Sequence, residues 1–135
     1  MSLFSQATRR RVRSRAHGQC EYCLLPEQAS FYPHHVDHVI AQKHGGGSDL
    51  DNLAWACFQC NVSKGSNIAG YDPETGQLTP LFNPRTQAWE DHFQLNGPII
   101  QARTPEGRVT LALLQFNHPE RVEMRVSLLS LKLWP

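Results

Sequence analysis

The sequence predicts an α+β fold in which a strand–loop–strand–helix unit is held together by paired cysteines. Three observations lead to this prediction. A basic segment with helical character opens the chain, the cysteines occur as two close pairs, and extended segments separated by a glycine-rich turn lie between the pairs. With 135 residues, of which 40% are hydrophobic, the chain is expected to form one compact unit with a modest core.

Composition and the first residues argue against a membrane or secreted protein. Mean hydropathy is −0.45, and no apolar run approaches the roughly 20 residues that span a bilayer. The opening stretch SLFSQATRRR lacks the hydrophobic segment of a secretory signal. We therefore expect a cytoplasmic protein with no membrane partner.

Residues 5–17 are predicted to form a helix that ends before Gly18. Val12 and Ala16 form a narrow apolar stripe, and five arginines surround it. The first 20 residues carry a charge of +5 without any acid, whereas the other 115 carry −4. This helix is either a solvated face or a surface that contacts DNA phosphates through Arg9, Arg10 and Arg13.

The four cysteines form two C-x2-C pairs, Cys20/Cys23 and Cys57/Cys60. Disulfides are not expected in a cytoplasmic protein. Two such pairs are typical of a four-cysteine zinc site, and that zinc is structural because four thiolates leave no open position. The alternatives are redox-active dithiols or buried thiols. The 33 residues between the pairs exceed the usual spacing of about 15 to 20, so an insertion lies between them.

The insertion is predicted to contain two strands, and the second cysteine pair opens a helix. FYPHHVDHVIA (31–41) is strand-like, and KHGGGSD (43–49) allows a tight turn because glycine accepts positive φ. LDNLAWA (50–56) is a second short strand or an extended arm, with Trp55 expected in the core. A short helix from Phe58 to about Asn67 follows.

Residues 70–135 are predicted to be a mostly helical extension packed on a core formed by residues 1–69. The stretch 70–80 is turn-rich and is expected to be a connector. Helix starts are predicted at Asn83-Pro84, Thr104-Pro105 and Asn117-His118, where an N-cap residue precedes a proline in the first turn. IIQA (99–102) is a candidate strand. The last segment fits a strand or a helix, and its start signal favours the helix.

Four polar residues in and just after the insertion could form a reaction centre. Asp37 and Asn61 offer the hard oxygen ligands that suit Mg²⁺ or Mn²⁺. His38 can accept a proton near neutral pH. With a cationic surface nearby, these groups fit hydrolysis of a phosphodiester. Neighbouring residues of a strand point to opposite faces, so Asp37 and His38 share one site only if the strand ends or bulges there.

The motifs CEYC, VDHVIA, GGGSDLDNLAWAC and CFQCNVSKG resemble those of the HNH endonuclease family, whose centre is a ββα-metal fold. The resemblance covers about residues 15–68. It implies that His38 is the general base and that Asp37 and Asn61 bind the catalytic divalent ion. Asn52 would brace the loop between the strands and so orient His38. Asn61 stands where the family usually has a histidine, although asparagine also occurs there, and an Asp/Asn pair favours Mg²⁺.

We therefore expect a metal-dependent endonuclease that hydrolyses DNA and nicks one strand per active site. Lys64, one turn after Asn61, could reach the scissile phosphate or be solvated. One alternative is a zinc-stabilised nucleic-acid-binding module without catalysis. The other is a protein-interaction domain that uses the C-terminal helices, through which a homodimer or a protein partner could also form.

Overall fold

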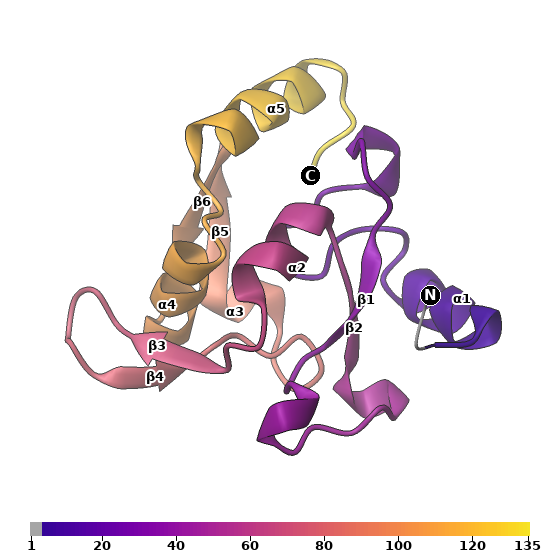
Figure 1. The fold of residues 1–135 in the computed structure, drawn as a ribbon. Coiled ribbons are helices and arrows are strands. Elements are labelled where there is room, and N and C mark those ends of the chain that lie inside the picture. Colours follow the sequence, from indigo (N-terminus) through magenta and orange to yellow (C-terminus); the bar gives the residue numbers. More distant parts are fainter. Residues whose placement is uncertain (1–3) are drawn as a thin grey trace.

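An antiparallel hairpin followed directly by a helix lies at the centre of the computed structural model, which describes residues 4–135 (Figure 1). Strand β1 (His35–His38) pairs with β2 (Leu53–Ala56), and α2 (Phe58–Lys64) begins two residues later. The register runs without a bulge from His35 opposite Ala56 to His38 opposite Leu53. The connecting loop contains the 3-10 turns η2 (Gln42–His44) and η3 (Leu50–Asn52). The predicted strand–loop–strand–helix order is confirmed, although β1 is shorter than the predicted strand.

The two faces of this hairpin are covered by different helices. Leu53 and Trp55 pack against Val12 and Ala16 of α1 (Gln6–Arg15) in one cluster. Because Val36 and His38 stand opposite Trp55 and Leu53, they lie on this same face. On the other face, Ala54 and Ala56 join a larger core that includes all four cysteines. Residues with odd numbers in β1, including Asp37, therefore face this larger core.

Helix α1 forms where the sequence predicted it. The hydroxyl of Ser5 accepts a hydrogen bond from the Thr8 amide at 3.1 Å and caps the helix. The helix ends at Arg15, and His17 and Gly18 follow with positive φ. After the helix comes η1 (Glu27–Ala29). In Figure 1, α1 lies on the side of the hairpin away from α2.

The C-terminal extension contains two more hairpins and three helices. The strands are β3 (Ala69–Tyr71) with β4 (Leu78–Pro80), and β5 (Phe93–Asn96) with β6 (Ile99–Ala102). The helices are α3 (Trp89–His92), α4 (Pro105–Leu113) and α5 (Pro119–Ser130). The helical prediction for the last segment and the strand prediction for IIQA are confirmed.

Three sequence predictions for the extension are wrong in detail. Residues 70–80 form the β3–β4 hairpin and not a simple connector. No helix starts at Asn83, because its side chain accepts a hydrogen bond from the Arg85 amide at 2.8 Å and closes a turn. Helix α5 is capped by His118, since Asn117 instead hydrogen-bonds to both backbone groups of Ile100, at 2.8 and 3.1 Å.

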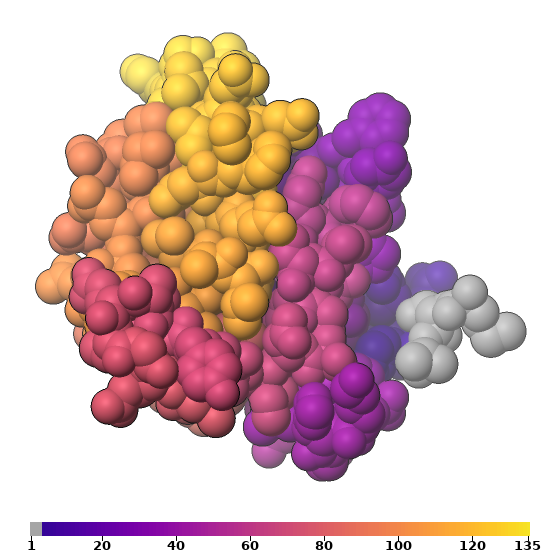
Figure 2. All heavy atoms as spheres, turned by 60° about the vertical axis from the view of Figure 1, so that its left-hand side comes forward, coloured from indigo at the N-terminus to yellow at the C-terminus, as the bar shows by residue number. Residues whose placement is uncertain are grey.

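The extension and the cysteine region share one hydrophobic core. Phe82, Phe93, Phe116 and Leu128 belong to the same buried cluster as the four cysteines. Figure 2 shows the orange and yellow C-terminal segments lying against the magenta segment that contains α2. Within residues 4–135, no helix has the length and apolar character needed to cross a membrane.

Candidate functional site

The four cysteines converge on one point in the core. Their sulfur atoms all lie within 4.8 Å of one another, and each thiol is buried. Four sulfurs at 2.3 Å from a tetrahedral zinc ion would be separated by about 3.8 Å, and Cys23 and Cys57 are 3.6 Å apart. The backbone amides of Tyr22, Cys23 and Cys60 turn toward the first sulfur of each pair, at 3.4 to 3.5 Å. The donor set and its geometry therefore fit a structural zinc ion.

A half-buried arginine from the extension contacts this cluster. Arg121 of α5 donates to the Cys60 sulfur at 3.1 Å and approaches the Cys57 sulfur at 3.9 Å. Burial alone lowers the pKa of Arg121, but negative charge on the cysteines outweighs this and the pKa is raised. The guanidinium also donates to the Leu114 carbonyl at 2.6 Å. Arg121 therefore brings a fixed positive charge to the thiolates, a contact that no sequence motif indicated.

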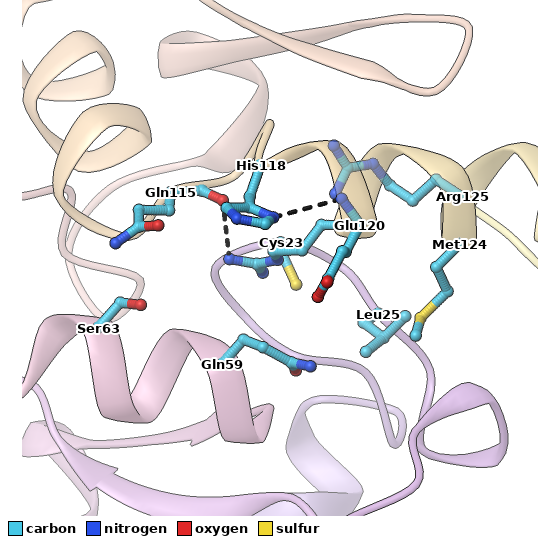
Figure 3. Close-up of a pocket in the computed structure, with 10 residues that line it drawn as sticks. Cys23, Leu25, Gln59, Ser63, Gln115, His118, Glu120, Met124 and Arg125 are labelled. Atoms are coloured by element: carbon cyan, nitrogen blue, oxygen red, sulfur yellow. Dashed lines mark hydrogen bonds between the residues drawn. The ribbon is translucent and has the colours of Figure 1, made fainter.

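A hollow of about 270 Å³ lies beside the cysteines, between α2 and α5 (Figure 3). Cys23 lines it together with Gln59, Ser63, His118 and Met124. Burial raises the pKa of the Cys20 and Cys60 thiols, whereas hydrogen bonds from the neighbouring thiols lower that of Cys23. A bound zinc ion would hold all four as thiolates.

The imidazole of His38 lies on the α1 face of the hairpin. Its Nε2 atom is 3.0 Å from the Ser48 hydroxyl, and its ring centroid is 5.2 Å from that of Phe4. The side chain is half-buried, so one ring nitrogen can reach a solvent molecule or a substrate. Ser48 was not singled out from the sequence, because a serine in a glycine-rich loop usually has only a turn-forming role.

Asn52 binds the two ends of the loop that carries Ser48. Its Oδ1 accepts from the Ile40 amide at 2.9 Å, and its Nδ2 donates to the Ile40 and Gly47 carbonyls at 2.9 and 2.8 Å. A Cβ at Gly46 would lie 1.7 Å from the Ile40 carbonyl oxygen, so only glycine fits there. These contacts hold the loop in one position beside His38.

The carboxylate of Asp37 is on the opposite face and is already neutralised. It is 5% exposed, accepts from the Tyr22 hydroxyl at 2.7 Å, and lies 3.1 Å from the ammonium of Lys64. Lys64 also donates to the His38 carbonyl at 3.0 Å. Burial raises the pKa of Asp37 even though Lys64 and Tyr22 act in the opposite direction, and burial beside Asp37 raises that of Tyr22.

The structure therefore divides the predicted reaction centre between two faces. Asp37 and the helix that carries Asn61 lie on one side of the hairpin, and His38 lies on the other. Lys64 is 1% exposed and bound to Asp37, so it does not face a phosphate. Asn61 makes no side-chain hydrogen bond to the rest of residues 4–135. In this structure the Asp37 carboxylate is held by Lys64 and Tyr22.

The arginines of α1 fall into two groups. Arg13 pairs with Glu27 at 2.8 Å, Arg9 lies 5.4 Å over the Trp55 ring, and Arg15 donates to the Leu50 carbonyl at 2.9 Å. These three fasten the helix to the hairpin region.

Arg10 and Arg11 have no partner among the residues that the structure describes, and both line a surface hollow beside Leu50.

Residues 20–67 match the family model described as HNH endonuclease. This stretch holds the hairpin, α2 and all four cysteines, so the match to the HNH model coincides with the strand–loop–strand–helix unit. The fold of this domain and its cysteine cluster agree with the resemblance seen in the motifs. Searches of curated proteins and of solved structures found no match.

Proposed function

We propose that this protein is an endonuclease that hydrolyses DNA phosphodiester bonds, with His38 as the general base. The half-buried imidazole of His38 carries the proposal, because the loop braced by Asn52 holds it in place inside an HNH domain. Such a site is built for proton transfer at a fixed position. One such centre per chain would nick a single strand.

In the proposed reaction, His38 removes a proton from the water that attacks phosphorus. The Nε2 atom now faces the Ser48 hydroxyl at 3.0 Å, and a water hydrogen-bonded to Nε2 would transfer its proton there. The P–O bond to the 3′ oxygen breaks as the new P–O bond forms. Arg10 and Arg11, which have no partner within residues 4–135, would hold the phosphate backbone without reading sequence.

A catalytic Mg²⁺ or Mn²⁺ ion would stabilise negative charge on the phosphate and the leaving oxygen. Asp37 and Asn61 have the oxygen donors that such an ion prefers. Asp37 can serve it only after Lys64 gives up the carboxylate, which is 3.1 Å from the ammonium in the free chain. We therefore propose that these two residues bind an ion only when substrate is also present, and that the end of β1 at His38 then rearranges so that the base and the ion reach one phosphate.

The same ion pair supports a second candidate function, a zinc-stabilised nucleic-acid-binding module that does not cleave. In this alternative, Asp37 and Lys64 are a permanent structural pair joining β1 to α2. The zinc site and the arginines would have the same roles in both cases.

Cleavage of supercoiled plasmid separates the two functions. With Mg²⁺, the chain should produce nicked circles, and His38→Ala should lower the rate by about 10²–10⁴-fold, the usual contribution of a general base. The control is His44→Ala, an exposed histidine in the same loop region. Zinc content, the thermal unfolding midpoint and DNA affinity should be unchanged in both variants. Cleavage by His38→Ala at the rate of the parent chain would leave only the binding module.

A further inference from the structure

Two neighbouring aromatic side chains project from the segment that leads into β1. Phe31 is 92% exposed and Tyr32 is 49% exposed. Their ring centroids are 5.1 Å apart in an edge-to-face arrangement, and Tyr32 stacks on Phe58 of α2 at 4.5 Å. Because Phe58 holds Tyr32, this aromatic pair has a defined position on the surface.

The aromatic pair contributes little to the core. An exposed phenylalanine forgoes most of the roughly 1.5–3 kcal/mol that burial of such a side chain contributes. Phe31 belongs to neither hydrophobic cluster of the described chain. Two adjacent exposed aromatic rings are therefore better explained by a ligand than by folding.

The two residues that follow the aromatic pair in the chain line a cationic groove. Pro33 and His34 line one side of this hollow of about 270 Å³, and α1 forms the other side. Three guanidinium groups line it with a single acid, Glu27. The arginines are Arg9, Arg10 and Arg13. The imidazole of His34 is 1% exposed, and its Nδ1 has no hydrogen-bond partner among the described residues.

Charge and shape together define the ligand. The positively charged groove suits a polyanion, and the aromatic pair suits a flat ring with an open face. A nucleic-acid strand offers both, but in a duplex the faces of the bases are covered by stacking. A base can stack on Phe31 without the free-energy cost of leaving the duplex only if it is already unpaired.

We propose that the groove and the aromatic pair bind an unpaired nucleic-acid strand, with phosphates along α1 and bases stacked on Phe31 and Tyr32. This rests on the proposed function, in that nucleic acid is taken as the substrate. Helix α1 covers the hairpin face that carries His38, and the His38 ring is 5.2 Å from that of Phe4 just before α1. The phosphates along α1 would therefore lie on the face where the proposed base is found, whereas the bases would stack on the aromatic pair that packs on α2. The preferred substrate contains a single-stranded segment.

Binding is measured without cleavage, so that failure of the nuclease proposal does not affect the result. The chain carries His38→Ala and is kept free of Mg²⁺ and chelator. Fluorescence anisotropy then compares a labelled 20-nucleotide DNA strand, the same sequence as a duplex, and an RNA strand of that sequence. A second strand carries 2-aminopurine, whose fluorescence falls when the base stacks on an aromatic ring.

We expect the single strand to bind more tightly than the duplex. Phe31→Ala should weaken single-strand binding by about 10-fold or more and abolish the 2-aminopurine quenching, with duplex binding unchanged. Phe31→Trp should retain both signals. The control is Tyr71→Ala, which removes a 72% exposed aromatic residue from β3 and should change neither. Comparison of the DNA and RNA strands shows which of the two unpaired nucleic acids the chain binds with higher affinity.

Three results would overturn the inference. The first is equal affinity for strand and duplex in the parent chain. The second is a Phe31→Ala variant that binds the strand as well as the parent does. The third is a loss that affects strand and duplex equally, which would indicate a general change of the surface. The second and third results would favour a protein partner, in place of nucleic acid, as the ligand of the aromatic pair.

Discussion

The residues of the two candidate metal regions alternate along the sequence, but the two regions differ in their state of assembly. The four cysteine sulfurs lie within 4.8 Å of one another, with Arg121 already placed to balance their charge. Asp37, by contrast, is bound by a lysine and a tyrosine, and His38 lies across the sheet from it. The cysteines need no rearrangement to hold zinc, whereas the proposed ion at Asp37 requires Lys64 to leave the carboxylate.

The difference follows from what each region contributes to folding. Four thiolates at the centre of a core carry more charge than the single guanidinium of Arg121 can balance, so binding of zinc would be part of the folding reaction. A buried carboxylate needs a partner at all times, and in the free chain the 1% exposed Lys64 is that partner. In the proposed mechanism, Lys64 stabilises the Asp37 carboxylate until substrate arrives and then leaves it.

The largest expected effect is at the cysteines. Cys57→Ser should prevent folding of the core, because structural zinc contributes about 10–16 kcal/mol to folding in small zinc domains. Circular dichroism and metal analysis on the purified variant measure this. Readdition of zinc to metal-stripped parent protein is the control and should restore the fold. A zinc-free sample with a native spectrum would contradict this, because the cysteine region would then fold without a bound ion.

The next effect is at the buried ion pair. Lys64→Met and Asp37→Asn should each lower the free energy of unfolding by about 3–5 kcal/mol, since each leaves a buried polar group without its partner. The double variant should lose less than the sum of the two. Urea denaturation gives all three values, with the exposed Lys43→Met as the matched control. Losses below about 0.5 kcal/mol would mean that Lys64 and Asp37 do not depend on each other.

A smaller effect is expected where the extension contacts the cysteines. Arg121→Met should weaken zinc binding by about 10–100-fold, which is typical when a group hydrogen-bonded to a metal ligand is lost. The rate of zinc release to a colorimetric chelator reports this. Arg103→Met, an exposed arginine of the same extension, is the control. Equal release rates would make Arg121 a packing residue only.

The smallest effect concerns the two free arginines of α1. Replacing Arg10 and Arg11 with Gln should flatten the slope of log affinity against log salt by about 1.8, or 0.9 for each lost phosphate contact. Arg13→Gln should change the slope less, because its guanidinium is occupied by Glu27 at 2.8 Å. A slope that responds to Arg13 and not to Arg10 and Arg11 would reverse the assignment.

Local sequence signals predicted the central fold well, but they did not indicate which partners the polar residues of the candidate site would take. The cysteine spacing, the glycine-rich turn and the strand alternation all report on neighbours in sequence, and they indicated the hairpin, α2 and the zinc cluster. The alternation rule also raised the conflict between Asp37 and His38. It could not show that the strand continues without a bulge, nor that Lys64 would fold back onto Asp37.

The parts that were missed depend on contacts between distant residues. Arg121 is 61 residues from Cys60, and nothing in the sequence of α5 distinguishes it from a surface arginine. Tyr22 lies inside a cysteine pair, where its hydroxyl could have had many partners besides Asp37. Asn83 and Asn117 look like helix caps, but one closes a turn and the other binds β6. Such choices are made by tertiary packing, which overrides local preference.

The most direct measurement is a titration of the zinc-loaded protein with Mn²⁺ in the absence of nucleic acid, followed by electron paramagnetic resonance. Asp37→Asn is titrated in parallel. Because Lys64 lies 3.1 Å from the Asp37 carboxylate, we expect no saturable Mn²⁺ site that depends on Asp37 in the free chain. We expect such a site to appear once an uncleavable DNA strand is added. One tightly bound Mn²⁺ per free chain that is lost in Asp37→Asn would contradict this, because the ion site would then be assembled before substrate binds.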